Sequence, residues 1–211
     1  MFYPVRIPWL VKKIYNKYTW HIDGPEPAVY LTFDDGPHPE VTQFVLDELR
    51  KYNAKATFFC IGDNVQKYPE MYKEVLMEGH RIGNHTQNHL NGWEVDDDAY
   101  IKNVYKAAEL IDSDLFRPPY GKITNFQAKL LMGENVQNKR PYRIIMWDVL
   151  SGDFDRKITG EQCLINVMRK TRKGSIITFH DSERAYPRLK IALPAVMKNL
   201  SDKGFEFKSI A

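Results

Sequence analysis

The sequence predicts an α/β fold in one domain, and two observations support this prediction. Seven short runs rich in β-branched, aromatic and aliphatic residues alternate with segments of helical periodicity, which is typical of parallel strands joined by right-handed crossovers. The chain has 211 residues, enough for one sizeable core, and no linker or low-complexity segment divides it. A doubly wound sheet and a closed barrel both fit this pattern. No GxGxxG follows the first strand, which disfavours dinucleotide binding.

Each expected element has a local signal. The first strand, 28–33, is an apolar run that stops at Asp34 and Asp35 and at the turn residues Gly36 and Pro37. Further strands are expected at 56–61, 81–84, 115–117, 142–149, 175–179 and 205–210. Helices are expected where apolar residues recur with a period of 3.6, at 39–52, 69–78, 96–111, 125–132, 160–170 and 189–200. We expect Pro194 to kink the last of these helices.

Composition narrows the class of protein. The net charge is +3 and the basic residues are scattered, so no nucleic-acid-binding surface is expected. Cys60 and Cys163 are expected to be core residues rather than a disulfide framework. The apolar runs are too short to span a bilayer and no signal peptide is visible, so the expected location is the cytoplasm or the inner membrane surface. The oligomeric state is left open.

Residues 1–24 precede the α/β pattern and form an N-terminal extension, while the domain itself is expected over 25–211. The segment 7–20 is short and amphipathic, with Trp9 and Leu10 beside Lys12 and Lys13. We expect a helix packed on the domain, and a weak membrane-surface contact is the alternative.

Polar side chains gather where the expected strands end. Asp34 and Asp35 follow the first strand, and the later strands are followed by His85 and His89, Arg117 and Tyr120, Asp153, and His180 and Asp181. In a parallel barrel these strand ends lie on one face, where barrel enzymes place their active sites. The sequence therefore predicts a site at the carboxyl ends of the strands.

The segment His85–His89 has the spacing HxxxH. On a helix this spacing would put both imidazoles on one face, where they could bind one metal ion. A carboxylate from the end of the first strand would complete two histidines and one aspartate, which is a catalytic metal site with an open position for water.

Five ordered segments resemble the motifs of the polysaccharide deacetylase family, the NodB-homology enzymes of carbohydrate esterase family 4. The segments are 32–37 (TFDDGP), 85–89 (HTQNH), 117–121 (RPPYG), 147–154 (from Trp-Asp to Asp-Phe) and 177–181 (ITFHD). The resemblance runs from Ala28 to the C-terminus, and it implies a distorted (β/α) barrel of about seven parallel strands.

The resemblance also implies a role for each matched residue. Asp35, His85 and His89 would bind one divalent metal, which we expect to be zinc, with cobalt, nickel or manganese as alternatives. Asp34 would act as the general base and Arg117 would pair with it. The backbone N–H of Tyr120 would stabilise the oxyanion.

On the other side of the site, the resemblance makes His180 the general acid and Asp153 the carboxylate that orients it. Asp148 and Asp155 are alternatives to Asp153, because both lie nearby in the sequence. Trp147 would be either a wall of the site or a core aromatic residue.

Two positions depart from the family pattern. Phe154 stands where the family has Trp, so the wall keeps a ring but loses an indole N–H. Thr178 stands where the family has Leu in the pocket for the acetyl methyl group, so the pocket is expected to be smaller or more polar.

These observations predict a metal-dependent hydrolase that removes an N-acetyl group from an amino sugar in a chitooligosaccharide, a peptidoglycan-type glycan or a lipid-linked sugar. The absence of a visible export signal favours a small or lipid-linked substrate. The alternatives are an O-acetyl esterase or sugar deformylase, a hydrolase of a small non-sugar amide, and a non-catalytic sugar-binding relative.

Overall fold

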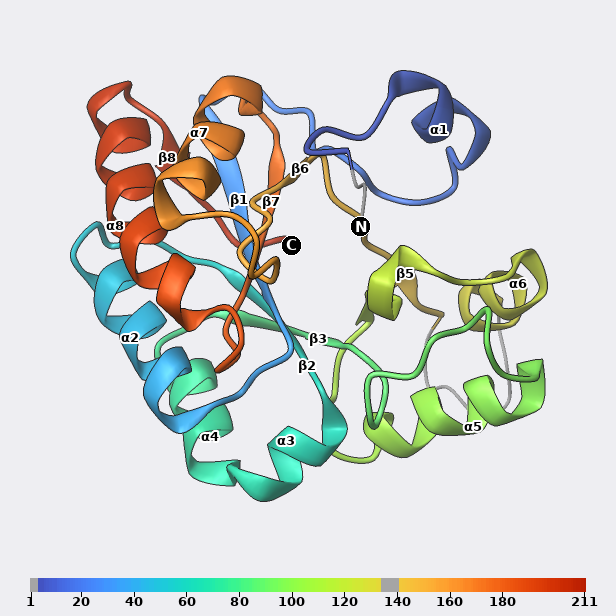
Figure 1. Ribbon diagram of the computed structural model, residues 1–211. Coiled ribbons are helices and arrows are strands. Elements are labelled where there is room, and N and C mark those ends of the chain that lie inside the picture. Colours follow the sequence, from blue (N-terminus) through green and yellow to red (C-terminus); the bar gives the residue numbers. More distant parts are fainter. Residues whose placement is uncertain (1–3, 134–140) are drawn as a thin grey trace.

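The computed structural model describes residues 4–133 and 141–211. These residues form a curled parallel sheet with helices packed around it (Figure 1). The strands are β1 (Ala28–Asp34), β2 (Thr57–Cys60), β3 (Arg81–Asn84), β4 (Leu115–Phe116), β5 (Arg143–Ile144), β6 (Val149–Leu150), β7 (Ile176–His180) and β8 (Glu206–Phe207). Their order is β5-β4-β3-β2-β1-β7-β6, β8 pairs with β1, and all of these pairings are parallel. The predicted α/β fold is confirmed, as a half-barrel that stays open between β5 and β6.

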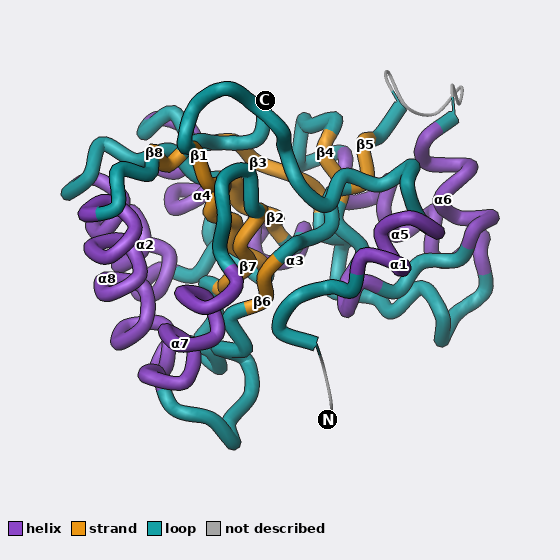
Figure 2. Tube along the Cα trace, turned by 90° about the horizontal axis from the view of Figure 1, so that it is seen from above, coloured by secondary structure: helices purple, strands orange, loops and turns teal. Residues whose placement is uncertain are grey.

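Helices cover the sheet in two groups (Figures 1 and 2). The helices are α1 (Trp9–Ile14), α2 (Pro39–Arg50), α3 (Gly62–Lys67), α4 (Pro69–Met77), α5 (Asp97–Ala108), α6 (Asn125–Met132), α7 (Gly160–Lys170) and α8 (Tyr186–Asp202). The apolar faces of α2, α4, α7 and α8 bury the larger core against β1, β2 and β7, whereas α5 and α6 pack near β4 and β5. The short helix α3 was not predicted, and α8 continues through Pro194.

The strand alternation decides which side chains reach the site. In β1, Leu31 and Phe33 face the larger core, so the opposite face of the strand carries Thr32 and Asp34. The register pairs Thr32 with Thr178 and Asp34 with His180 across β1 and β7. Asp34 and His180 therefore lie side by side at the carboxyl end of the sheet.

The expectation of one strand over 142–149 is wrong. The structure has β5 and β6 there, at opposite ends of the strand order. The buried Arg117 side chain explains part of this break, since its Nε donates to Ile145 O and its Nη2 to Met146 O. Those carbonyls satisfy a guanidinium instead of continuing a strand ladder.

The N-terminal segment lies against both edges of the opening. Thr19 bridges to Ile145, and Arg6 bridges to Val149. Of the expected helix over 7–20, only α1 forms, and none of its residues is buried. The membrane contact suggested for this segment stays a prediction. In the part of the chain that the structure describes, no helix has both the length and the apolar character that crossing a bilayer requires.

Asp148 connects this segment to the sheet. Its carboxylate is fully buried, receives a hydrogen bond from Lys12 and lies 2.8 Å from Ser175 Oγ, and Arg6 Nε lies 3.5 Å away. Replacing Asp148 removes these charged hydrogen bonds, while Lys12 and Arg6, which are 17% and 37% exposed, remain accessible to water.

We therefore expect Asp148→Ala to lower the free energy of unfolding by about 2 kcal/mol. Urea unfolding followed by circular dichroism measures this loss. Asp202→Ala is the control, because the Lys198–Asp202 pair is exposed and contributes little. Equal stabilities of Asp148→Ala and the parent would mean that the cluster does not hold the segment.

Candidate functional site

The first part of the site is an aspartate held by a buried arginine. Arg117 Nη1 donates to Asp34 Oδ1 at 2.6 Å and to Thr32 Oγ1 at 2.8 Å. The guanidinium is fully buried and lies 4.1 Å from the centre of the Phe59 ring. These contacts fix the plane of the guanidinium, and with it the position of the Asp34 carboxylate.

Burial raises the pKa of the Asp34 carboxyl, and the charge of Arg117 offsets that effect only in part, so the pKa lies above its ordinary value. A carboxylate with a raised pKa accepts a proton more readily near neutral pH. Asp34 is therefore suited to act as a base.

Asp35, His85 and His89 form the second part of the site. Their ligand atoms all lie within 4.8 Å of one another, and Asp35 Oδ1 is 3.2 Å from His89 Nε2 and 3.7 Å from His85 Nε2. Asp35 Oδ1 is buried and has no hydrogen-bond partner among the described residues. A buried carboxylate oxygen facing two imidazole nitrogens fits a divalent cation.

The protonation of His85 agrees with a ligand role. His85 Nδ1 lies 2.7 Å from the carbonyl oxygen of Arg117, an acceptor that places the proton on Nδ1 and leaves Nε2 free to bind. Burial, assisted by the charge of His89, lowers the pKa of His85 well below its ordinary value, so the ring stays neutral.

The two histidines do not lie on a helix, as the spacing suggested. They lie on either side of a turn at 86–88, and Thr86 and His89 have φ values of 67° and 60°. Asn84 Oδ1 accepts a hydrogen bond from Thr86 N at 2.8 Å and supports that turn. The HxxxH spacing therefore brings the imidazoles together through a turn.

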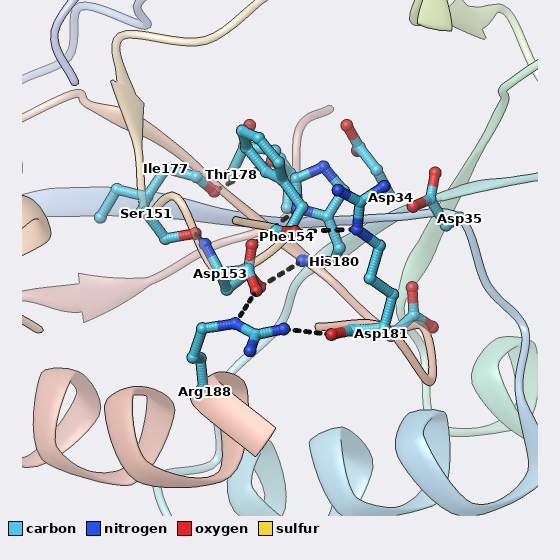
Figure 3. A network of polar contacts seen from close by, with 12 residues as sticks. Asp34, Asp35, Ser151, Asp153, Phe154, Ile177, Thr178, His180, Asp181 and Arg188 are labelled. Atoms are coloured by element: carbon cyan, nitrogen blue, oxygen red, sulfur yellow. Dashed lines mark hydrogen bonds and ion pairs between the residues drawn. The ribbon is translucent and has the colours of Figure 1, made fainter. Parts of the chain in front are cut away.

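The third part of the site is the pair His180 and Asp153. His180 Nδ1 lies 2.7 Å from Asp153 Oδ1, and His180 N donates to Asp153 Oδ2 at 2.8 Å (Figure 3). Arg188 Nε donates to the carbonyl of Asp153 at 2.5 Å. Asp148 and Asp155 were the alternatives to Asp153. Asp148 instead pairs with Lys12 of the N-terminal segment, and Asp155 accepts a hydrogen bond from Lys157 N, so Asp153 is the carboxylate beside the imidazole.

Burial alone would lower the pKa of His180, but the charge and hydrogen bond of Asp153 outweigh it and raise the pKa to about 9. Asp35 and Asp34 act in the same direction. The imidazolium can therefore donate a proton at neutral pH.

Asp153→Asn should move the basic limb of the kcat/KM profile to lower pH. The loss of a hydrogen-bonded opposite charge shifts a pKa by about 1–3 pH units, whereas the parent should lose activity near pH 9. The stability from this ion pair is complete below pH 6.5 and disappears as the pH rises through about 9. A pH–rate series of both proteins tests this, with Asp155→Asn as the control, and an unmoved limb would contradict the pairing.

The remaining expected residues occupy different depths. Tyr120 is 60% exposed with its ring 4.6 Å from that of His89, and the Phe154 ring is 5.1 Å from that of His180. Both rings border the polar groups. Trp147 packs against two clusters of buried hydrophobic residues, one containing Met146 and the other Ile145, and the centre of its ring lies 5.9 Å from the Arg117 guanidinium carbon.

Thr178 lies beneath the base, since it is only 1% exposed and its Oγ1 is 3.1 Å from Arg117 Nη1 and from Thr32 Oγ1. Its hydroxyl therefore supports Arg117, a contact that the family's Leu could not make.

Two residues next to the site were missed as parts of it. Asn64, which lies outside the five matched segments, donates from Nδ2 to Asp35 O at 2.7 Å. Asp181 was noted only as a strand-end acid, and its carboxylate accepts from Gly36 N at 3.1 Å and Thr42 Oγ1 at 2.5 Å. Burial raises the pKa of Asp181 to about 7. The sequence signals for Asp181 were its place at a strand end, directly after His180, and within the segment ITFHD.

Comparisons with known proteins agree with this geometry. The family model described as polysaccharide deacetylase matches residues 21–132. A peptidoglycan-N-acetylglucosamine deacetylase of Bacillus cereus is 33% identical over 204 residues, which cover 92% of this chain and 72% of the relative. A chitooligosaccharide deacetylase of Azorhizobium caulinodans is 37% identical over 165 residues, which cover 74% of each chain.

Among solved structures, the Bc1960 peptidoglycan N-acetylglucosamine deacetylase superposes with a TM-score of 0.84 at 30% identity. The match covers 97% of this chain and 95% of that one.

Proposed function

This chain belongs to the polysaccharide deacetylase family, and on that premise we propose that it hydrolyses the N-acetyl group of an N-acetylated amino sugar. One observation carries the proposal. Asp34, a base held by a buried arginine, lies beside a group that fits a metal, and it is paired in register with His180 across β1 and β7. Base, metal group and acid are the parts that hydrolysis of an unactivated amide requires.

Asp35, His85 and His89 would hold one divalent cation, which we propose is zinc, since two imidazoles and a carboxylate suit it. Such a cation supplies Lewis-acid polarisation of the scissile carbonyl and of the attacking water. The chain's own groups move the protons. Asp34 takes a proton from the water, and Arg117 keeps the carboxylate aimed at it.

As the C–N bond breaks, His180 Nε2 gives a proton to the leaving amine, while Asp153 stabilises the imidazolium through Nδ1. We assign the Tyr120 backbone N–H to the developing oxyanion. The rings of Tyr120 and Phe154 lie beside His89 and His180, where they can pack against the sugar.

For the substrate, we propose a glycan that contains N-acetylglucosamine, because the relatives above are named as peptidoglycan and chitooligosaccharide deacetylases. Thr178, which stands where the family has Leu, is buried under Asp34 and contacts Arg117. The acyl group that the site prefers is therefore a quantity for the substrate panel to measure.

The test is a substrate panel. The zinc- or cobalt-loaded protein is offered chitooligosaccharides, peptidoglycan fragments, an O-acetylated xylan and an N-formylated amino sugar, and released acid and free amine are quantified. Acetate together with a new amine supports the proposal. Release from the ester or formamide alone would replace it with the corresponding esterase or deformylase, and glycan binding without release would indicate a non-catalytic relative.

A further inference from the structure

The peptide bond between Asp35 and Gly36 is held at both of its polar atoms. Its carbonyl oxygen accepts a hydrogen bond from Asn64 Nδ2 at 2.7 Å, and its N–H donates to Asp181 Oδ1 at 3.1 Å. Asn64 comes from α3 and Asp181 follows β7, so two segments far apart in the sequence form hydrogen bonds to one peptide unit. Figure 3 shows Asp35 and Asp181 close to each other beside the base Asp34.

The backbone conformation of Asp35 explains why this peptide requires two hydrogen bonds to hold it. Asp35 has φ of 78°, in the left-handed region that residues with a Cβ avoid. Strained conformations persist only where the surroundings enforce them, and they cluster at functional sites. Here the strained residue is the one whose carboxylate faces His85 and His89.

Asp181 fits this role closely. Its side chain is fully buried and its other oxygen is bound by Thr42 Oγ1, so the carboxylate cannot rotate freely. A Cβ added at Gly36 would lie 2.0 Å from Asp181 Oδ2. The glycine is therefore required by the close approach of this carboxylate.

Asn64 also ties Asp35 to the turn that carries both histidines. At the start of α3, Gly62 N donates to Thr86 O at 3.0 Å and Asp63 N to Gln87 O at 2.8 Å. The same helix thus contacts the Asp35 loop through Asn64 and the histidine turn through its backbone. A shift of one ligand relative to the other two would break these bonds.

We propose that Asn64 and Asp181 are positioning residues that clamp the Asp35–Gly36 peptide and so hold the Asp35 carboxylate at the spacing a divalent cation requires. The proposal rests on the metal site of the proposed function, but not on the reaction. Residues that orient a metal ligand typically change metal affinity by about 10–100-fold when they are removed.

The experiment measures zinc affinity by chelator competition and the visible spectrum of the cobalt-loaded protein. It also measures amide hydrogen exchange at Gly36 in the metal-free protein. Asn64→Ala and Asp181→Ala should bind zinc about 10–100-fold more weakly, alter the cobalt spectrum and accelerate exchange at Gly36. Asp181→Asn should restore most of the affinity, because its amide oxygen can still accept from Gly36 N.

Asn166→Ala is the matched control, since Asn166 Nδ2 donates to Ser151 O at 3.0 Å without contacting a ligand loop. It should leave zinc affinity and Gly36 exchange unchanged. If Asn64→Ala does not fold, Asn64→Leu keeps the volume and removes the donor. Folded Asn64 and Asp181 variants with parental zinc affinity and parental Gly36 exchange would overturn the clamp.

The clamp and the proposed function fail in different ways. A parent protein that binds zinc and loses affinity in these variants, yet releases acetate from no substrate, keeps the clamp and removes the deacetylase. If the parent releases acetate, and the variants keep parental zinc affinity and parental Gly36 exchange, the deacetylase function stands and the clamp is removed.

Discussion

Asp34→Asn should lower kcat by about 10²–10⁴-fold, the usual contribution of a positioned general base, while leaving divalent metal bound. The amide keeps the shape of the carboxylate and can still accept from Arg117 Nη1, but it cannot take a proton from water. The metal group is untouched, because Asp35, His85 and His89 supply its ligand atoms.

Steady-state deacetylation and metal analysis of the same preparation check both halves of this result. Asp47→Asn is the control, because Asp47 is an exposed helix residue that bonds Arg50. If Asp34→Asn kept near-parental turnover, the base would have to be another group. If it lost the metal as well, Asp34 would be a ligand.

Chelation of the parent protein should abolish its activity, and added zinc or cobalt should restore it. The His85→Ala variant should bind metal at least about 100-fold more weakly, and added metal should not restore its activity. His85 is buried and neutral with Nε2 free to bind, so its loss removes one of the three ligand atoms of the metal group. Isothermal titration with zinc measures the affinity.

His80→Ala provides the matched control for His85→Ala. His80 is also buried and neutral, and burial lowers its pKa to about 4, but its Nδ1 accepts from Ala56 N, and His80 is not among the residues of the metal group. It should lose stability and keep its metal affinity. Activity of the parent that survives complete chelation would contradict a metal-dependent reaction.

Much of the fold was predictable from local patterns. The apolar run 28–33 ends at two acids and a Gly-Pro turn, so both the strand and its end are local properties of the chain. The α/β alternation likewise predicted parallel strands. The expected strand 142–149 was wrong in part because Arg117, which lies in a distant part of the chain, donates to two of its carbonyls.

The site divides in the same way. The residue types could be recognised from the sequence because five ordered segments resemble the motifs of the polysaccharide deacetylase family. These segments contain the candidate residues Asp34, Asp35, His85, His89, Arg117 and His180. For the partner of His180, the resemblance indicated Asp153, but Asp148 and Asp155 stayed open as alternatives because both lie nearby in the sequence. Only packing puts Asp153 at 2.7 Å from the imidazole and Asp148 among the cations of the N-terminal segment.

The chain alone therefore determined which chemical groups stand at the ends of its strands, since that depends on short-range alternation and turn residues. Their final geometry depended on folding. The left-handed backbone of Asp35 is held by Asn64 and Asp181, which lie 29 and 146 residues away in the sequence. Contacts between such distant residues form when the sheet curls and have no local signature, so no periodicity or motif could have revealed them.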